Sequence, residues 1–384
     1  MSDKIAMPRS AGPDGARSAV PLGGVTTVTD VARRPRRRPV RGWWRRCASL
    51  FVLPAAAALV LSACGSSSDG SASGGTDQVV VGLITKTDTN PFFVKMKEGA
   101  EKAAAAKGVK LLTAAGKFDG DNASQVTAIE NMVASGARGI LITPSDTKAI
   151  IPAIAKARAK GVLVIALDSP TDPQSAVDAL FATDNFQAGV LIGEYAKGIT
   201  GGEPVKIAML DLAPGITVGT LRHNGFLSGF GAVDVADTAS EPVSAASVVC
   251  SQDTQGDQAK GQAAMETCLQ KDPGINLVYT INEPAALGAY TAIAAAGKEN
   301  DVTIVSVDGG CTGVQAVKDG KIAATSQQYP LKMAQQSVDA VIAYATDGTK
   351  PSGYVDTGVT LITAKPVDGI DSENVQFGLD NCWG

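Results

Sequence analysis

The sequence is poor in the residues on which enzymes and metal sites most often depend. Its 384 residues include one histidine, His223, and aromatic residues make up 5% of the chain. The cysteine spacings match no zinc pattern, so no metal site is expected. No Walker sequence is present and no G-x-G-x-x-G follows a predicted strand, which argues against a cradle for nucleotide phosphates. A formal net charge of −4 gives no sign of a nucleic-acid partner.

Much of the positive charge gathers before a short apolar segment near the N-terminus. Arginines crowd residues 33–46, and the apolar run 47–61 that follows is shorter than the roughly 20 residues that a membrane-spanning helix needs. A basic block before a short apolar run is typical of a secretory signal, so we expect an extracytoplasmic protein. Residues 1–30 lack periodicity, and both a disordered segment and a start codon placed too far upstream fit them.

The apolar run ends in Leu61-Ser62-Ala63-Cys64-Gly65, which resembles the lipobox of bacterial lipoproteins. The resemblance implies that Cys64 receives lipid, becomes the mature N-terminus and anchors the protein to the cell membrane. The alternative is a plain signal peptide with a fortuitous cysteine. Residues 64–77 are rich in Gly and Ser and predict a flexible tether, which favours the anchored form. Residues 1–63 are then an N-terminal extension and lipoprotein signal peptide.

Cysteines beyond the predicted signal are even in number. They are Cys250, Cys268, Cys311 and Cys382. An even count in an exported chain favours two disulfides, for which three pairings are possible. We favour Cys250 with Cys268, which closes a local loop onto a helix, and Cys311 with Cys382, which would pin the C-terminal tail.

From Gln78 onward, apolar strand patterns alternate with amphipathic helical ones, which predicts an α/β fold with right-handed βαβ crossovers and parallel sheets. Strands are predicted at 79–85, 109–114, 139–143, 162–167, 205–210, 232–236, 275–280, 302–307 and 323–327. Helices are predicted at about 91–107, 123–135, 148–160, 218–230, 257–271, 284–297, 312–319 and 331–346. The two successive blocks are similar in size and lack a low-complexity linker. We therefore expect two similar lobes joined by short segments, a geometry suited to hinge closure.

Polar residues follow several of these strands at the point where each strand ends. Pro91 predicts a helix start with Asn90 as its N-cap, and two aromatic rings follow. Ligands of open α/β sheets bind at the carboxyl ends of strands. Each such residue alone is at least as often a cap or a core residue as a ligand contact. Their convergence favours a binding cleft, with the candidates Lys86, Asn90, Phe92, Phe93, Asp168, Ser169, Asp184, Arg222, Asn282, Asp308 and Gln328.

This set of side chains suits a polyhydroxyl ligand. Carboxylates accept hydrogen bonds from hydroxyls, Arg and Lys donate to them, and amides do both. Aromatic rings such as Phe92 and Phe93 can cover the apolar face of a sugar ring. A phosphate ester would require more cations and a glycine-rich cradle, and no cofactor is implied.

The order of several short stretches between Gln78 and Thr363 resembles the type I periplasmic sugar-binding proteins of the ribose-binding group, the receptor components of ABC importers. The stretches are Thr89-Asn90-Pro91-Phe92-Phe93, Leu167-Asp168-Ser169, Ala182-Thr183-Asp184-Asn185, Arg222-His223-Asn224-Gly225-Phe226, Ile281-Asn282-Glu283-Pro284-Ala285-Ala286-Leu287-Gly288, Val307-Asp308-Gly309 and Gln328-Tyr329-Pro330. The resemblance implies a sugar pocket lined by Asn90, Phe92, Phe93, Asp168, Arg222, Asn282, Asp308 and Gln328.

The resemblance also implies a three-segment hinge, with crossings between the lobes near Asp184, Gln328 and Gly358. The resulting lobes are 78–184 with 329–358 for the first, and 185–328 with 359–384 for the second. Sequential blocks read from the strand pattern would not give this interleaving.

Two departures from the ribose receptor concern the charged groups of the cleft. The ribose receptor has Arg where this chain has Ser169, and Ser where this chain has Lys86. The run from Gly82 to Gly99 more closely resembles fructose-binding members of the group. On this resemblance we favour fructose over ribose, mannose or a polyol. A polar group left unpaired in a closed cleft is costly, so the two departures should strongly alter the selectivity for sugars.

Other protein classes are weighed against a non-enzymatic receptor. A glycosidase could use Asp168 and Asp308 as its acid pair, but these would come from opposite lobes, and His223 is interpreted as an exposed helix residue. Lactose-repressor-type regulators share the fold but carry a DNA-binding helix-turn-helix before it. A sensor reporting to a membrane kinase or chemoreceptor would differ only in partner. The favoured protein is a monomer that closes on a monosaccharide and docks on the permease subunits of an ABC importer.

Overall fold

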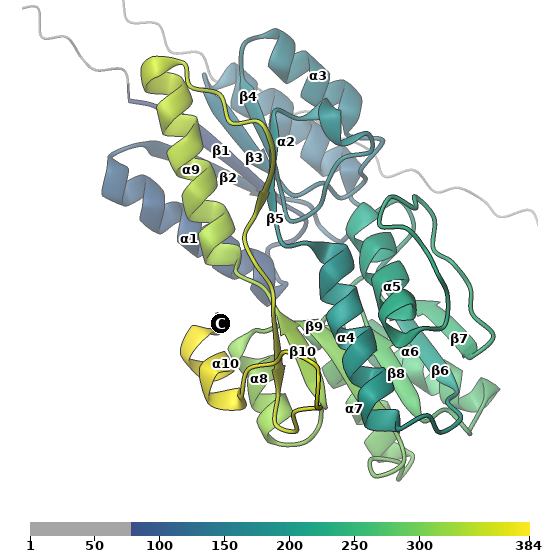
Figure 1. Ribbon diagram of the computed structural model, residues 1–384. Coiled ribbons are helices and arrows are strands. Elements are labelled where there is room, and N and C mark those ends of the chain that lie inside the picture. Colours follow the sequence, from purple (N-terminus) through teal and green to yellow (C-terminus); the bar gives the residue numbers. More distant parts are fainter. Residues whose placement is uncertain (1–77) are drawn as a thin grey trace, which may run out of the picture. The chain divides into compact units, whose positions relative to one another are not determined.

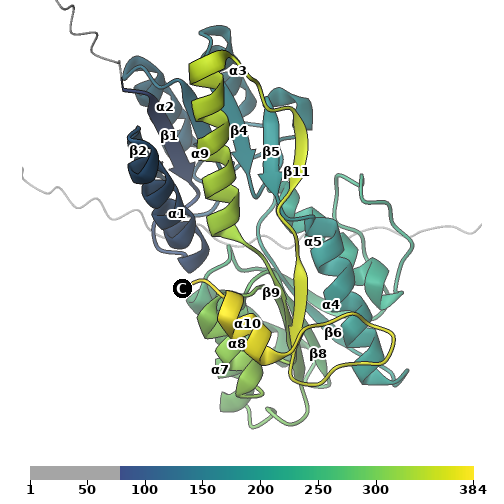
Figure 2. The ribbon, with the colours of Figure 1, turned by 60° about the vertical axis from the view of Figure 1, so that its left-hand side comes forward.

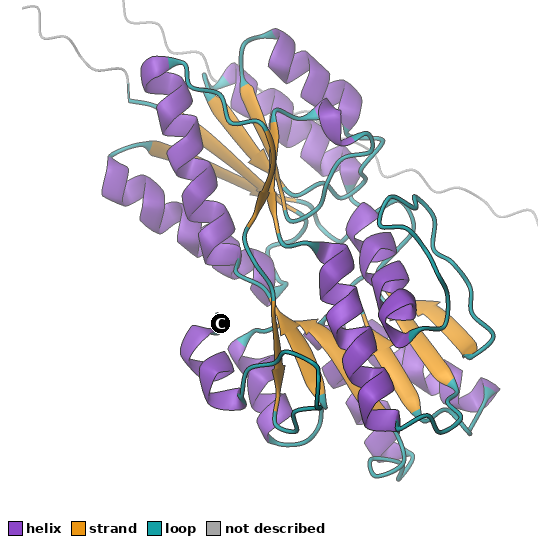
Figure 3. Cartoon of the chain, in the orientation of Figure 1, coloured by secondary structure: helices purple, strands orange, loops and turns teal. Residues whose placement is uncertain are grey.

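The structure, a computed structural model, describes residues 78–384. The predicted signal segment, the lipidation site Cys64 and the tether lie outside the described residues. The described chain forms two sheets of six strands each, with helices packed on their faces (Figures 1 and 3). This confirms the predicted α/β fold class. Between residues 78 and 384, no helix has both the length and the apolar character needed to cross a bilayer.

The first sheet is entirely parallel and has the strand order β11-β5-β4-β3-β1-β2. Its strands are β1 (Val80–Thr85), β2 (Lys110–Ala115), β3 (Gly139–Ile142), β4 (Leu163–Leu167), β5 (Ala179–Ala182) and β11 (Gly353–Asp356). Its helices are α1 (Pro91–Lys107), α2 (Asn122–Ala134), α3 (Ile151–Ala159), the short 3-10 helix η1 (Gln174–Ala176) and α9 (Pro330–Asp347). All residues of β3 and β4 are buried, as expected for central parallel strands covered on both faces. Helices α1 and α9 pack side by side on one of these faces (Figure 2).

The second sheet has the order β12-β10-β9-β8-β6-β7 and is parallel except for β12, which runs antiparallel to β10. Its strands are β6 (Ile207–Asp211), β7 (Val248–Asp253), β8 (Leu277–Thr280), β9 (Thr303–Asp308), β10 (Ala324–Gln327) and β12 (Thr360–Thr363). Its helices are α4 (Asn185–Thr200), α5 (Thr217–Phe230), α6 (Gln258–Lys271), α7 (Glu283–Ala295), α8 (Cys311–Lys318) and α10 (Val375–Asn381). We call each sheet with its helices a lobe.

Consecutive strands near the C-terminus belong to different lobes. Strand β11 completes the first sheet, and β12, which follows the short irregular segment 357–359, joins the second (Figure 2). The chain also passes between the sheets from β5 to α4 and from β10 to α9. Each lobe is therefore assembled from separate stretches of sequence. The residue-level lobe boundaries given above remain a prediction.

Close contact between α4 and α5 fixes the position of the side chains that α5 carries into the centre of the protein. Gly189 and Gly193 on α4 face α5, while Gly225 and Gly229 on α5 face α4. A Cβ atom at Gly225 would collide with the carbonyl oxygen of Phe186, so the two backbones are in direct contact. Interior glycines weaken a helix relative to alanine, which explains why the sequence pattern did not predict α4.

The strand predicted at 232–236 is wrong. The backbone N–H groups of Ala232 and Val233 both donate to the carbonyl oxygen of Leu227, at 2.9 and 3.4 Å, and so complete the C-terminus of α5. These groups are therefore not free to pair with a strand. The edge of the second sheet is instead β7, which the pattern did not predict, and α10 was not predicted either.

His223 is not the exposed helix residue that the sequence suggests. Its side chain is buried, and its two ring nitrogens lie 2.8 Å from the Asp211 carboxylate and 2.8 Å from the Val243 carbonyl oxygen. Both disulfide pairings are confirmed, Cys250 with Cys268 and Cys311 with Cys382.

Candidate functional site

Side chains that follow strands in both lobes meet around one small cavity. Its volume is about 30 Å³, and it is lined by Lys86, Asn90, Phe92, Phe93, Asp119, Asp168, Leu212, Val218, Arg222, Ile281, Asn282, Asp308 and Gln328. All the predicted ligand residues except Ser169 and Asp184 are among them. We call this set the inner cluster.

Arg222, in the second turn of α5, lies at the centre of the inner cluster. Its Nε donates to Asn185 Oδ1 and its Nη1 donates to the Ile281 carbonyl, both at 2.9 Å. Its guanidinium also lies 3.6 Å from an Asp168 oxygen and 3.5 Å from an Asp308 oxygen. Asp168 belongs to the first lobe and Asp308 to the second, so one buried cation contacts an acceptor of each lobe.

The two carboxylates stand on unusual backbone. Asp168 has φ 61° and Asp308 has φ 139°, a region that side-chain-bearing residues rarely adopt. Such conformations cost free energy and persist where the surrounding structure holds them, which is common at ligand sites. Ser169 Oγ donates to Asp168 Oδ2 at 3.0 Å, so Ser169 acts on the cluster by orienting Asp168. The other oxygen, Asp168 Oδ1, has no hydrogen-bond partner among the described residues.

Glu283 holds the backbone turn that presents Asp308. Its buried carboxylate accepts the N–H groups of Gly309 and Gly310 at 2.8 and 2.9 Å, and the Thr325 hydroxyl at 2.7 Å. Burial and the nearby charge of Asp308 raise the pKa of Glu283. Burial likewise raises the pKa of Asp308, while the Arg222 guanidinium opposes that rise. Asp308 thus has one carboxyl group, Glu283, and one arginine, Arg222, as charged neighbours in the second lobe.

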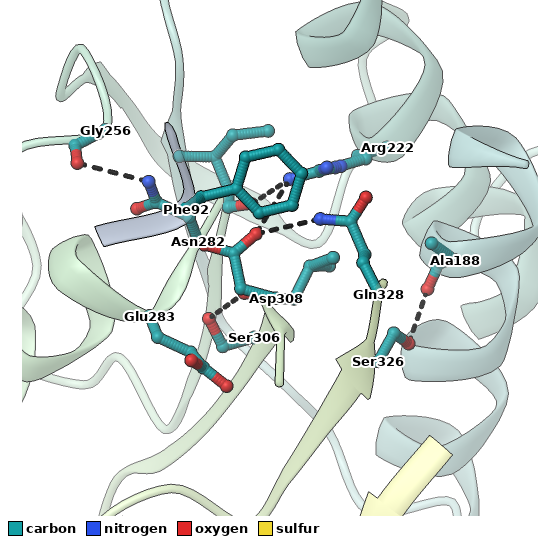
Figure 4. Close-up of polar contacts among 12 residues, drawn as sticks. Phe92, Ala188, Arg222, Gly256, Asn282, Glu283, Ser306, Asp308, Ser326 and Gln328 are labelled. Carbon is teal, nitrogen blue, oxygen red and sulfur yellow. Dashed lines mark hydrogen bonds and ion pairs between the residues drawn. The ribbon is translucent and has the colours of Figure 1, made fainter. Parts of the chain in front are cut away.

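Three amides add donors and acceptors to the inner cluster. Asn90 caps α1 by accepting the Phe92 N–H at 3.0 Å, as predicted, and Asn282 caps α7 by accepting the Ala285 N–H at 3.1 Å. Gln328 Nε2 donates to Asp308 Oδ1 at 2.9 Å, and its Oε1 has no partner within the described chain. Figure 4 shows Arg222, Asp308 and Gln328 pointing toward one another, with Asn282 nearby.

An aromatic wall borders the cluster. The rings of Phe92 and Phe93 meet edge to face at 5.4 Å, and Phe92 meets Trp383 in the same way at 5.3 Å. Trp383 comes from the C-terminal tail, and its Nε1 donates to the Gln328 carbonyl at 2.9 Å. The bond between Cys311 and Cys382 ties this tail to α8. The tail therefore supports both a predicted aromatic contact and the backbone of a predicted amide contact.

Lys86 and Asp119 bring two more buried charges from the first lobe. Lys86 follows β1, and its Nζ lies 5.9 Å from the centre of the Phe93 ring. Burial lowers the pKa of Lys86 and raises that of Asp119, and each charge counteracts the shift of the other. Both residues line the same small cavity as Arg222 and belong to the inner cluster.

A larger cavity adjoins the inner cluster. It has a volume of about 410 Å³, and Asn90, Asp119 and Asp308 line it as well. Its walls come from Lys117 and Phe118 of the first lobe and from residues 255–260 of the second. We call it the cleft mouth, because its walls come from both lobes and it shares Asn90, Asp119 and Asp308 with the inner cavity.

Asp184 does not reach the inner cluster. It is exposed, and its carboxylate caps α4 by accepting the Gln187 N–H at 2.9 Å. Sequence reasoning missed Asp119, although the acidic turn Asp119-Gly120-Asp121 comes shortly after a strand. It also missed Trp383, for which the neighbouring Cys382 was the available signal. Among residues 78–384, no group of three or more His, Cys, Asp or Glu side chains could hold a metal ion.

Comparison with known proteins identifies relatives over most of this region. Residues 81–350 match the family model described as "Periplasmic binding protein domain". The ribose import binding protein of Bacillus subtilis is 32% identical over 273 residues, which cover 70% of this chain and 84% of that protein. The D-ribose/D-allose-binding protein of Pseudomonas aeruginosa is 30% identical over 337 residues, which cover 83% and 99%.

Solved structures give the same result for the fold. An ABC transporter periplasmic solute binding protein of Actinobacillus succinogenes with bound D-allose matches with a TM-score of 0.65 and 26% identity, over 74% of this chain and 98% of that one. A carbohydrate transporter solute binding protein of Agrobacterium radiobacter in complex with D-arabinose matches with a TM-score of 0.66 and 27% identity, over 75% and 95%.

Proposed function

The chain belongs to the periplasmic binding protein family, as a type I sugar-binding protein of an ABC importer, and on this premise we propose that its ligand is D-fructose. Its relatives are binding proteins for transport, so its role is to hold a sugar and not to convert it. A protein of this family works outside the cytoplasm.

The observation that carries the proposal is the position of Arg222 between the carboxylates of the two lobes. Asp168 and Asp308 can each accept a ligand hydroxyl, and the guanidinium can donate to the same hydroxyl oxygens. Phe92 and Phe93 supply the apolar surface that the C–H face of a sugar ring needs. A monosaccharide held here would touch both lobes at once.

Hydrogen bonds between the two lobes support binding by hinge closure. The Thr147 N–H of the first lobe donates to the Gly215 carbonyl of the second at 3.0 Å, and the Thr217 hydroxyl donates to the Thr147 hydroxyl at 2.9 Å. The inner cavity of about 30 Å³ is smaller than a usual ligand pocket of roughly 300 Å³ or more, so a sugar must enter while the lobes stand apart. The ligand then favours closure through its greater affinity for the closed form.

Fructose is preferred because of the residues next to Arg222. Lys86 places a buried cation beside Phe93, and Ser169 leaves only a hydroxyl next to Asp168. The named relatives bind ribose, allose and arabinose, so ribose, mannose and polyols are the competing ligands. In a closed cleft, a ligand that leaves the Lys86 ammonium unpaired binds weakly.

Delivery to the importer completes the proposal. The protein acts as a monomer, anchored through lipid on Cys64, and its closed form docks on the permease subunits. Support comes from the lipobox-like sequence and the tether of residues 64–77.

Sugar binding can be followed through the protein's own tryptophan. Trp383 is the one tryptophan beyond Trp43 and Trp44, and it contacts Phe92. Titration with D-fructose, D-ribose, D-mannose and xylitol, read by Trp383 fluorescence and by calorimetry, should show the tightest binding for D-fructose. Tighter binding of another compound would replace fructose as the ligand. Release of product from nitrophenyl glycosides would overturn the receptor function itself.

A further inference from the structure

Two buried charges of the first lobe make no ion pair with each other. Lys86 is 2% exposed and Asp119 is 5% exposed. Asp119 Oδ1 finds no hydrogen-bond partner in the described part of the chain. The two residues line the same small cavity, and each electrostatically shifts the pKa of the other. The cavity therefore contains a donor and an acceptor that the described protein groups leave available.

The loop that carries Asp119 is rigidly built. Asp121 accepts the Lys117 N–H at 3.0 Å and the Ser124 N–H at 3.1 Å, and its own N–H donates to the Phe118 carbonyl at 3.1 Å. At Gly116 the loop packs so closely on β1 that a Cβ would lie 2.6 Å from the Lys86 carbonyl oxygen. Asp119 is thus fixed beside Lys86 by contacts that do not involve its own side chain.

Burying two charges without a hydrogen-bonded contact is unfavourable for the ligand-free protein. Desolvation of an unpaired ionised group is costly, and protein interiors normally pair such groups. One hydroxyl placed between these side chains would relieve the cost, because it donates to the carboxylate and accepts from the ammonium. Arg222 differs from Lys86 in this respect, because Asn185 and the Ile281 carbonyl already accept hydrogen bonds from it.

From this arrangement, and resting on the proposed function above, we propose that Lys86 and Asp119 form a subsite for one hydroxymethyl group of the sugar. The position of Asp119 suits a hydroxymethyl group that projects from the sugar ring. Asp119 lines both the inner cluster and the cleft mouth, whereas Arg222 and Asp168 line the inner cluster alone. A ring held by Arg222 and Asp168 would therefore direct an exocyclic arm toward Asp119.

This subsite separates fructose from ribose on chemical grounds. The furanose ring of D-fructose carries two hydroxymethyl groups, and that of D-ribose carries one. A sugar whose second hydroxymethyl group fills the subsite should therefore bind more tightly. A site that is built to bond a hydroxyl rejects analogues that lack it, because its buried polar groups are then left unpaired.

The test pairs changes in the protein with changes in the sugar. Calorimetry measures D-fructose, 1-deoxy-D-fructose and 6-deoxy-D-fructose on the unmodified protein and on the Asp119→Asn and Lys86→Met variants. On the unmodified protein, one deoxy sugar should bind at least about ten-fold more weakly than D-fructose, and on each variant this ratio should fall below about three-fold. Exposed Asp88 and Lys102 supply the matched controls Asp88→Asn and Lys102→Met, which should keep the full ratio.

Each result has a defined consequence. A ratio that persists in Asp119→Asn and Lys86→Met overturns the subsite while leaving fructose as the ligand. Equal binding of all three sugars to the unmodified protein overturns it as well. Absence of D-fructose binding to the unmodified protein defeats the proposed ligand, and the subsite then falls with it. Loss of binding in both Lys86→Met and Lys102→Met would indicate a general effect of lost charge and would also count against the subsite.

Discussion

The two cations of the cleft are held in different ways. Arg222 reaches the inner cluster from α5 of the second lobe, and protein groups accept from its Nε and Nη1 at 2.9 Å while two carboxylates flank it. Lys86 follows β1 of the first lobe, and within residues 78–384 its ammonium contacts an aromatic ring but forms no ion pair. Both side chains are nearly fully buried.

This difference separates two tasks of a binding protein. A cation that already donates to its own protein, and that contacts carboxylates of both lobes, organises the acceptors and couples ligand binding to closure. A cation without a protein partner gains a hydrogen bond only when a ligand supplies an oxygen. We therefore assign affinity and closure to Arg222, and discrimination among sugars to Lys86 with Asp119.

Removal of the organising cation should have the largest effect. In Arg222→Met, Asp168 and Asp308 lose their counter-ion, and removing one partner of a buried charge pair costs about 2–5 kcal/mol, so D-fructose affinity should fall about 100-fold or more. Isothermal titration calorimetry measures this loss. Circular dichroism should show that the fold is retained.

Arg138→Met is the matched control for that variant, because Arg138 is exposed and lies on Tyr344 away from the inner cluster. Its D-fructose affinity should equal that of the unmodified protein. Unchanged D-fructose affinity in Arg222→Met would show that Arg222 does not bind the sugar, and Lys86 would then be the principal cation of the site.

The contact between α4 and α5 offers a way to move Arg222 without replacing it. In Gly225→Ala the added methyl group meets the Phe186 carbonyl, and overpacking of this kind costs about 1–3 kcal/mol of unfolding free energy. The shift of α5 should also separate Arg222 from Asn185 and lower D-fructose affinity. Urea unfolding and calorimetry measure the two effects, with Ser228→Ala on the same helix as control. A destabilised variant with full affinity would show that Arg222 tolerates displacement.

Sequence predicted the organising residues but only Lys86 of the selecting pair, for a physical reason. Asn90, Asp168, Asn282 and Asp308 directly follow strands or begin helices, so the alternation of elements along the chain locates them at one edge of each sheet. Asp119 lies within a loop whose shape depends on Asp121 and on packing against β1. No periodicity in the sequence encodes that contact.

Other features escaped prediction because hydrogen bonds or packing contacts decide them, and the pattern of apolar and polar residues shows neither. Trp383 reaches Phe92 because the disulfide and hydrogen bonds to Cys311 and Gln328 hold the C-terminal tail in place. The alternating run 232–236 favours a strand, yet its N–H groups complete α5 instead. Asp184 resembles the other strand-end carboxylates, but local hydrogen bonding makes it a helix cap. Only the contact of Trp383 is distant in sequence, whereas local hydrogen bonds decide the roles of Asp184 and of residues 232 and 233.

Replacing both Lys86 and Asp119 should weaken fructose binding without lowering the stability of the ligand-free protein. Replacing both partners of a buried charge pair by uncharged groups of similar volume is often neutral or stabilising by about 1–4 kcal/mol. The double variant Lys86→Met/Asp119→Asn should therefore unfold at the same temperature as the ligand-free protein or at a higher one, while fructose binding weakens. Differential scanning calorimetry without sugar measures this. A clear fall in melting temperature would mean that the pair is structural.

The smallest effect concerns His223, which follows Arg222 on α5 but faces the loop that ends at Val243. Burial would lower the pKa of His223, yet the Asp211 carboxylate and the Val243 carbonyl outweigh it, so the pKa is raised from its ordinary value of 6.5. A raised pKa means that this contribution to stability is fully present below pH 6.5 and is lost as the pH rises through the pKa of the folded protein. The buried carboxyl groups Glu283 and Asp308 also titrate, so the informative quantity is the difference between the unmodified protein and His223→Gln. That difference in unfolding free energy should shrink as the pH rises from 6 to 8, whereas the ratio of fructose to ribose affinity should be the same in both proteins. A difference independent of pH would show that His223 is neutral. A changed ratio of fructose to ribose affinity would show that α5 couples His223 to the sugar site at Arg222.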